Sequence, residues 1–330
     1  MIFSSSAIID FFKKYDFSFF IFSAIIFIFG VINLYSATHS SSYVNNLYKT
    51  QIGWYALSFV IGVAISFFSP KSFYRYSYAI YFFNLILLVL VLVLGHKGMG
   101  AQRWLVIGPL RFQPSEMMKI SAVLALSRWF SKHNVDQELG IKELIIPFII
   151  AFVPMALIIL EPDLGTGLLI LLIFLAIAFY RKLKWKTILI LAVLGAITGG
   201  LMYQYGLKNY QKRRISTFLD PTADARGSGY NAIQSKIAIG SGKIIGKGFK
   251  KSSQASLNYL PENHTDFIFS IYNEEHGFVG SLLIITVYII LFFRFIWLSQ
   301  SVTRMFDSIM GIGLMSIFFW HTFKIGRAHV

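Results

Sequence analysis

The sequence predicts an all-α fold, a polytopic transmembrane helical bundle with about nine spans. Of its 330 residues, 56% are hydrophobic and only 14% are charged, whereas a soluble domain has about 25% charged residues. Apolar runs of about 20 residues recur along the chain, the length that crosses a hydrocarbon core about 30 Å thick. Cysteine is absent, which excludes disulfides, thiolate metal sites and cysteine nucleophiles.

We expect the spans at residues 17–35, 51–68, 78–95, 115–130, 144–160, 164–180, 187–203, 267–293 and 305–323. The first apolar run follows Lys13 and Lys14, but it is long and lacks a small-residue cleavage pattern. It is therefore predicted to be a span rather than a signal peptide. We interpret 1–323 as a single transmembrane domain, with a long loop, 204–265, inserted between the seventh and eighth spans.

The basic residues predict how the chain crosses the membrane. Short loops rich in lysine and arginine stay in the cytoplasm. With the N-terminus in the cytoplasm, the short outer loops hold only Lys49, Lys97, Arg103 and Arg111. The net charge of +15 is thus interpreted through membrane topology, and no nucleic-acid partner is expected.

The loop 204–265 departs from this rule because it is predicted to lie outside and is strongly basic. Its basic residues are Lys208, Lys212, Arg213, Arg214, Arg226, Lys236, Lys243, Lys247, Lys250 and Lys251. Long loops are translocated largely regardless of charge, so one interpretation is a solvated loop and the other is a site for an anionic ligand. Apolar residues at near-helical spacing predict an amphipathic helix over 230–239, at the outer interface.

Ionisable side chains at membrane depth are costly and are candidates for function. In a first group, Pro114 starts a helix, and Glu116 and Lys119 share one face of it. Lys119 is then about one turn inside the fourth span. One interpretation is a pair that only neutralises itself. The nearby Arg103 and Arg111 favour an anion site, because arginine forks match phosphate oxygens.

Two further groups lie at the outer ends of spans. Glu161 and Asp163 flank Pro162 after the fifth span, where the alternative is a helix–helix corner with solvated carboxylates. His264 and Asp266 lead into the eighth span. A partly desolvated Asp266 suits a general base, with His264 orienting it or titrating beside it. The alternative is an aspartate that caps the helix.

The remaining ionisable groups predict structure rather than chemistry. Glu274 and Glu275, about two turns further on, are expected to pair within the bundle, because carboxylates in an apolar run need a partner. The seven histidines have no metal-binding spacing, so a protein-ligated transition-metal site is not expected. No serine nucleophile motif is visible.

Eight stretches resemble the SEDS family of bacterial membrane proteins, which includes RodA and FtsW. They are Gly100–Trp104, Gly108–Glu116 with Lys119, Glu161–Thr166, Phe218–Pro221, Gly229–Ser235, Ala238–Lys243, Leu260–Phe269 and Glu274–Phe278. They follow the family's order and cover about residues 17–323. The run from Tyr230 to Ser235 and the run from Ser241 to Phe249 are more similar to RodA than to FtsW.

The resemblance implies a peptidoglycan glycosyltransferase that polymerises lipid II at the outer face of the bacterial cytoplasmic membrane, with a RodA-like role in cell elongation and shape. Its ligands would be lipid II and the glycan linked to undecaprenyl pyrophosphate. The resemblance also implies a partner, a class B penicillin-binding protein that crosslinks the new glycan. It implies that Asp266 is essential for polymerisation and that Arg111, Glu116 and Lys119 are functionally important.

The residues suit this chemistry. The pyrophosphate of lipid II is the leaving group, so negative charge develops on phosphate oxygens, and preorganised cations stabilise it. We assign this role to Arg111 and Lys119, with Arg103 and the pair Arg213 and Arg214 as weaker candidates. The acceptor sugar hydroxyl needs a base within hydrogen-bond reach, and Asp266 is the candidate.

Other polar residues complete the predicted site. Glu116, Glu161 and Asp163 are expected to orient the cations or to hold a divalent ion, Mg²⁺ or Mn²⁺, that bridges the pyrophosphate, because hard cations take oxygen ligands. Gln234 and His264 are further candidates for contact with the substrate.

Three other functions stay open. An FtsW-like division synthase shares the chemistry, a lipid II flippase would need polar groups through the midplane, and a scaffold for the crosslinking partner would need no catalytic residues. Ionisable groups at the outer ends of the spans favour catalysis. RodA-like proteins have a tenth span that this chain lacks. Residues 324–330 have no family counterpart, so we expect them to be a non-native tail.

Overall fold

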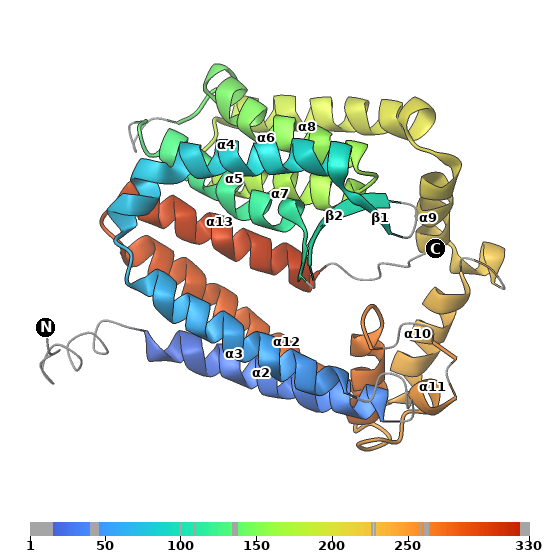
Figure 1. Cartoon of the computed structure of the whole chain (residues 1–330). Helices are drawn as coiled ribbons and strands as arrows, with labels where there is room; N and C mark the ends of the chain where they lie inside the picture. Colours follow the sequence, from blue (N-terminus) through green and yellow to red (C-terminus); the bar gives the residue numbers. More distant parts are fainter. Residues whose placement is uncertain are drawn as a thin grey trace, which may run out of the picture. The chain divides into compact units, whose positions relative to one another are not determined.

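The computed structural model describes residues 16–39, 46–98, 101–108, 110–133, 138–225, 227, 229–257, 259–260 and 264–323. Within these residues, a long helix lies at each of the nine predicted spans (Figure 1). They are α2 (Phe17–Thr38), α3 (Leu47–Ser66), α4 (Pro70–Leu94), α5 (Pro114–Phe130), α6 (Ile145–Leu160), α7 (Leu164–Tyr180), α8 (Trp185–Leu201), α12 (Ile268–Ser301) and α13 (Met305–Thr322). The predicted fold class is confirmed. Lys13, Lys14 and the tail 324–330 lie outside the described residues.

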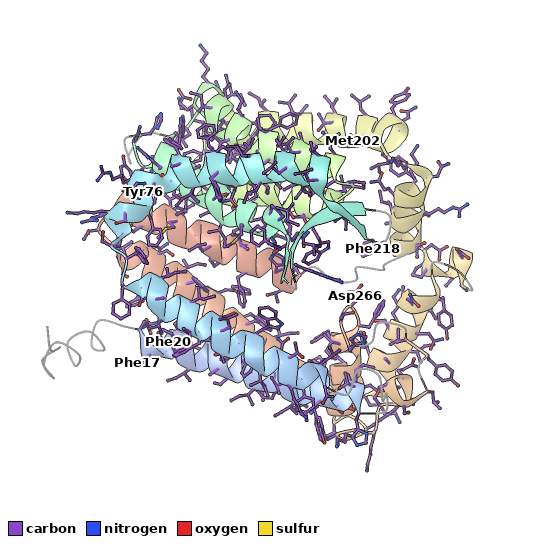
Figure 2. The ribbon with its side chains drawn as sticks, in the orientation of Figure 1. Phe17, Phe20, Tyr76, Met202, Phe218 and Asp266 are labelled. Atoms are coloured by element: carbon purple, nitrogen blue, oxygen red, sulfur yellow. The ribbon has the colours of Figure 1, made fainter. Side chains whose placement is uncertain are left out.

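Five stretches of the described chain are each long and apolar enough to cross a membrane. They are Phe17–Thr38, Pro70–Leu94, Lys142–Leu160, Trp185–Gly206 and Ile268–Ser301. Two of them include short extensions of a helix, the 3-10 turn η1 (Lys142–Leu144) and the π-helical turn η2 (Met202–Gly206). Many of their apolar side chains are exposed, including Phe17, Phe20 and Met202, which are labelled in Figure 2. Such a large apolar surface is unfavourable in water and suits contact with lipid.

The chain divides into two compact units. Unit 1 comprises the chain up to Val63 and Gly206–Arg294, and unit 2 comprises Ala64–Tyr205 and Phe295–Lys324. The single transmembrane domain expected over 1–323 stays a prediction.

Helix α5 forms the centre of unit 2. It packs against α4, α6, α7 and α13, and its Met118, Ala122 and Leu126 are fully buried. On α13, a Cβ added to Gly313 would collide with the side chain of Val123, so glycine allows α13 to approach α5 closely. The first turns of α5, which carry Glu116 and Lys119, are therefore built onto a well-packed helix.

A three-stranded antiparallel sheet precedes α5, and the sequence did not predict it. Its strands, in the order β1-β2-β3, are β1 (His96–Gly98), β2 (Ala101–Ile107) and β3 (Leu110–Phe112). Gly108 between β2 and β3 has a φ of 61°, which favours glycine in a tight turn. Val106 pairs with Arg111. Because β3 ends just before α5 begins, the sheet holds Arg111 ahead of that helix.

The long basic loop is folded. Its described elements are α9 (Asn209–Leu219), the 3-10 turn η3 (Pro221–Asp224), α10 (Tyr230–Ser241) and α11 (Ser253–Ser256). Helix α10 confirms the predicted helix over 230–239, and its position at the membrane interface stays a prediction. Ala238 is fully buried whereas Ile237 is exposed. The buried core of this part of unit 1 joins Ala238 to Ala255 of α11 and Ile271 of α12.

Helix α12 is interrupted at Gly277, which has φ 64° and ψ −164°. The backbone of the loop 243–248 fills the interruption. The hydrogen bonds run from Lys247 N to Glu274 O (2.9 Å), from Gly248 N to Glu275 O (2.9 Å), from Phe278 N to Lys243 O (2.9 Å) and from Val279 N to Ile244 O (3.1 Å). Gly246, with φ 83°, packs directly against the Glu275 carbonyl group. Since unpaired backbone groups are costly in a membrane, the loop stabilises the interrupted helix.

Candidate functional site

Glu116 and Lys119 lie on one face of α5 in unit 2, as the sequence predicted, and they form an ion pair. Pro114 is the first residue of α5, as the sequence predicted, and Lys119 follows about one turn later. The Lys119 side chain is only 1% exposed, and its Nζ donates a hydrogen bond to Glu116 Oε2 at 2.8 Å. A buried ammonium group is costly unless it is paired, and Glu116 provides this pairing while remaining partly exposed itself.

A third residue that the sequence did not predict joins this pair. Nε2 of His321, in the last turn of α13, forms a hydrogen bond with Lys119 Nζ. The same His321 atom lies 3.9 Å from Glu116 Oε2. The signal in the sequence was a lone histidine at the end of an apolar run, which is a polar group at membrane depth.

The two arginines before α5 have different surroundings. Arg111 is exposed on β3. Arg103, on β2, points to the corner between α6 and α7, where its Nε donates to the Glu161 carbonyl oxygen at 3.3 Å and its Nη2 donates to that of Pro162. Its Nε also lies 3.9 Å from Asp163 Oδ2. The structure therefore groups Arg103 with Glu161 and Asp163.

The two carboxylates at this corner are buried, so the alternative of solvated carboxylates is wrong. Asp163 is the N-cap of α7, where its Oδ1 accepts from Thr166 N at 3.2 Å and its Oδ2 accepts from Thr166 Oγ1 at 2.9 Å. Glu161 is 1% exposed, and neither of its carboxylate oxygens has a hydrogen-bond partner among the described residues. Burial and the negative charge of Asp163 raise the pKa of Glu161 to about 8, although Arg103 opposes the shift. Glu161 is thus mostly neutral at pH 7.

Asp266 and His264 lie in unit 1, in the turn that leads into α12; Figure 2 labels Asp266. The carbonyl of Phe267 accepts the first hydrogen bonds of the helix, from Ser270 N and Ile271 N. Phe267 therefore occupies the N-cap position, which argues against the alternative of a capping Asp266. Asp266 is half-buried, and its Oδ2 atom is shielded from solvent, which agrees with the predicted partial desolvation of its carboxylate.

Contacts across unit 1 hold the start of α12. Asn33 of α2 donates to the Ile268 carbonyl at 3.0 Å, and Ser270 shares a hydrogen bond of 2.7 Å with Ser235 of α10. Gln234, a predicted substrate contact, accepts a hydrogen bond of 3.2 Å from Gln254. In the structure, the Gln234 side chain therefore connects α10 to α11.

Glu274, within α12, binds the loop that precedes this helix. The sequence predicted a structural pairing for this carboxylate, and the structure shows one with Lys247. The fully buried carboxylate contacts Lys247 Nζ at 2.5 Å. It also accepts from Ser252 Oγ at 2.5 Å, from Ser253 Oγ at 2.7 Å and from the backbone N–H groups of Ser253 and Gln254. Several donors around one buried carboxylate offset its desolvation, so Glu274 fixes this loop against the turns that follow Asp266.

The remaining candidates lie on α9. Arg213 is exposed there, and the side chain of Arg214 lies outside the described residues. The predicted site residues thus fall in both units. Glu116 and Lys119 form one group, Arg103, Glu161 and Asp163 form another, and Asp266 belongs to unit 1.

A divalent ion would find few ligands in the protein alone. Among the described residues, no three histidine, aspartate or glutamate side chains are grouped as metal ligands. At the corner of α6 and α7 there are two carboxylates, and both oxygens of Asp163 are already bonded to Thr166. This donor set does not fit a closed Mg²⁺ or Mn²⁺ site, which needs about six oxygen ligands.

The fold and these groups define a multi-pass membrane protein with buried ion pairs at the ends of its helices. The model of the cell cycle protein family of FtsW, RodA and SpoVE matches residues 16–328. The chain therefore belongs to this family, which confirms the resemblance found in its motifs, and it is a multi-pass inner membrane protein.

Individual relatives agree with this assignment. Peptidoglycan glycosyltransferase MrdB of Escherichia coli K12 is 38% identical over 275 residues, which are 83% of this chain and 74% of MrdB. The probable peptidoglycan glycosyltransferase FtsW of Buchnera aphidicola subsp. Schizaphis graminum is 34% identical over 279 residues, which are 84% of this chain and 77% of that protein.

Solved structures also resemble the chain. A peptidoglycan synthase complex, described for its structural coordination of polymerization and crosslinking, contains a chain with a TM-score of 0.78 and 28% identity, over 93% of this chain and 84% of that one. The rod shape determining protein RodA of Thermus thermophilus has a TM-score of 0.67 and 25% identity, over 94% of this chain and 83% of that one.

Proposed function

We propose that this chain is a RodA-like peptidoglycan glycosyltransferase, which polymerises lipid II into glycan strands at the outer face of the cytoplasmic membrane during cell elongation. Membership of the family and the 38% identity to MrdB support the enzyme class. The FtsW relative quoted above is less similar, at 34%, which favours the elongation role over the division role.

One observation carries the proposal, the buried ammonium group of Lys119 beside Glu116 at the start of α5. During transfer, the bond between the anomeric carbon and the pyrophosphate breaks, and the pyrophosphate leaves with negative charge. A cation already fixed in a low-dielectric setting stabilises that charge without reorganising. Arg111, exposed on β3 just ahead of the same helix, supplies a second cation for the phosphate oxygens.

Asp266 is the proposed general base. It takes the proton of the acceptor sugar hydroxyl as that oxygen forms its bond to the anomeric carbon. Attack opposite the leaving pyrophosphate inverts this carbon. Partial burial suits Asp266 to the role because desolvation increases the affinity of a carboxylate for protons. Its position just before α12, a helix stabilised by the Glu274 contacts, restricts its movement.

The same proposal includes the membrane topology of the chain, its protein partner and a divalent cation. We place the N-terminus in the cytoplasm and the site outside, as the basic residues of the short loops indicate. A class B penicillin-binding protein is the proposed partner, and the resemblance to a chain of a synthase complex supports it. A divalent cation would be held mainly by the pyrophosphate, because the described residues do not form a closed set of oxygen ligands for it.

The test is polymerisation of labelled lipid II by the purified chain together with its partner. Wild type should form glycan strands and Asp266→Asn should form none. Asp307→Asn, which changes an aspartate in the first turn of α13, is the matched control and should retain activity. Polymer made by Asp266→Asn at the wild-type rate would contradict the assignment of the base. Lipid movement across vesicles without any polymer would instead support a flippase.

A further inference from the structure

Among the described residues, Lys119 forms hydrogen bonds with side chains from two different helices. Glu116 lies on its own helix at 2.8 Å, and His321 belongs to α13. Helices α5 and α13 pack against each other within unit 2. A pair three residues apart on one helix fixes an ammonium group only along that helix, so the contact from α13 adds a second, independent restraint.

The hydrogen bond between the Lys119 ammonium group and the His321 imidazole defines the protonation state of the imidazole. A charged lysine has three N–H donors and no acceptor. For Lys119 Nζ to donate to His321 Nε2, that nitrogen must offer its lone pair. His321 is then neutral, with its proton on Nδ1. The arrangement therefore requires one particular state of the imidazole ring.

We propose that His321 is a positioning residue for Lys119. Its neutral imidazole accepts a hydrogen bond from the ammonium group and, together with Glu116, holds it where the pyrophosphate of the substrate develops charge. This inference rests on the proposed function and extends it. His321 itself touches neither the substrate nor the reacting atoms, and it acts through Lys119.

The charged groups around His321 predict a response to acid. On α5 they are Glu116 and Lys119. Helix α7 also packs against α13, and it runs antiparallel, because Tyr180 near its end contacts Ser308 near the start of α13. Asp163 at the start of α7 is therefore at the same end as His321, bonded to Thr166. A proton on Nε2 would remove the acceptor and place a second positive charge beside Lys119.

Three substitutions separate hydrogen bonding from bulk. His321→Gln keeps a side-chain oxygen able to accept from Lys119 and should retain at least about a third of the activity. His321→Phe keeps the ring without an acceptor and should lower kcat about 10- to 100-fold, the loss expected for a hydrogen bond to a charged group. His321→Lys mimics the protonated state and should be at least as inactive. His133→Gln, three residues beyond the end of α5 that is remote from Lys119, is the matched control and should match wild type.

A pH profile adds a readout that a merely structural role would not change. Wild-type kcat should fall on the acid side, within the range in which imidazoles titrate, about pH 5 to 8. His321→Gln should lack that fall and should differ from wild type most at low pH. A fall of equal size and midpoint in His321→Gln would overturn the proposal, as would full activity of His321→Phe.

A measurement independent of activity keeps this inference separate from the proposed function. In ¹⁵N-histidine NMR of the full chain in lipid bilayers, with His321→Gln used for assignment, His321 should be the neutral Nδ1–H form at pH 7.5. Its Nε2 resonance should shift in Lys119→Met. An unchanged resonance would refute the contact even if glycan forms. If wild type makes no glycan, the proposed function fails, while the NMR result still decides whether His321 holds Lys119.

Discussion

Glu161 offers a test in which the size of the effect follows from the structure. Replacement by glutamine keeps the shape of the side chain and removes its ability to ionise. The pKa of the buried carboxyl is raised from 4.5 to about 8, so between these values the folded protein holds a proton that the unfolded chain releases. Because the folded state binds more protons there, the free energy of unfolding of wild type falls as the pH rises.

The slope of the free energy of unfolding against pH sets the size of the effect. Each pH unit between the two pKa values lowers the free energy of unfolding by about 1.4 kcal/mol, which gives about 3 kcal/mol between pH 5 and pH 7. For a chain of 330 residues, with an unfolding entropy of about 2 cal/mol/K per residue, this corresponds to about 4 °C in Tm. Glu161→Gln has no such proton to lose, so its Tm should rise relative to wild type by this amount over the same interval.

The assay is thermal unfolding in detergent at pH 5, 6, 7 and 8, followed by intrinsic tryptophan fluorescence. The difference in Tm between Glu161→Gln and wild type should grow with pH and level off above pH 8. Glu138→Gln, which changes an exposed glutamate, controls for the loss of one carboxylate and should show no such trend. Parallel curves for Glu161→Gln and wild type from pH 5 to 8 would refute the reasoning.

Three further changes test other parts of the structure. Lys119→Met removes the buried ammonium group and should lower the polymerisation rate at least about 100-fold, measured with labelled lipid II. Glu274→Gln weakens the contact with Lys247 and should lower the free energy of unfolding by about 2 kcal/mol, seen as a lower Tm. Gly246→Ala should lower it by more than about 1 kcal/mol, because φ is 83° and a Cβ would collide with the α12 backbone.

Controls and contrary results are specific to each change. Gly30→Ala replaces a glycine with open space around the added Cβ, so an equal loss of Tm in Gly246→Ala and Gly30→Ala would contradict the close-contact argument. A wild-type Tm in Glu274→Gln would show that the charge of this carboxylate adds no stability. Lys119→Met that polymerises normally would remove Lys119 from the site, provided that its Tm matches wild type.

The spans were predictable because an apolar run of about 20 residues is a strong signal for a transmembrane helix. Few other structures need so long an apolar run. Pro114 marked the start of α5 correctly. The predicted limits were too narrow where a span continues into polar sequence. Helix α4 begins at Pro70, among Lys71 and Arg75, and α12 runs on to Ser301. Hydropathy falls in those turns although the backbone remains helical, so the period of apolar residues alone could not locate the ends.

Contacts between distant segments were not predictable. The strands β1 to β3 have only three to seven residues each, too few for the apolar-length signal that predicted the spans, although Gly108 and Pro109 form a turn signal between β2 and β3. On α10 the fully buried residue is Ala238, a small side chain that packs with Ala255 of α11 and Ile271 of α12, and the apolar spacing of the helix did not single it out. His321 and Lys119 are 202 positions apart, and only the packing of α5 against α13 brings them together.

The local motifs were more informative about residue types than about partners. Glu116 and Lys119 were expected to meet because a helix places residues three apart on one face. Arg103 was assigned to the same anion site, but in unit 2 it binds the backbone of the α6–α7 corner. An arginine on a strand can reach several neighbours, and a single sequence does not state which one it contacts.

The interruption of α12 at Gly277 has a consequence for biosynthesis. The backbone groups of residues 243–248 find their hydrogen-bond partners at 274, 275, 278 and 279, which the ribosome adds later. The segment cannot reach its final form while the chain is still being extended through it. It must wait until the next span has been synthesised, so any delay at that step leaves its backbone groups without these partners.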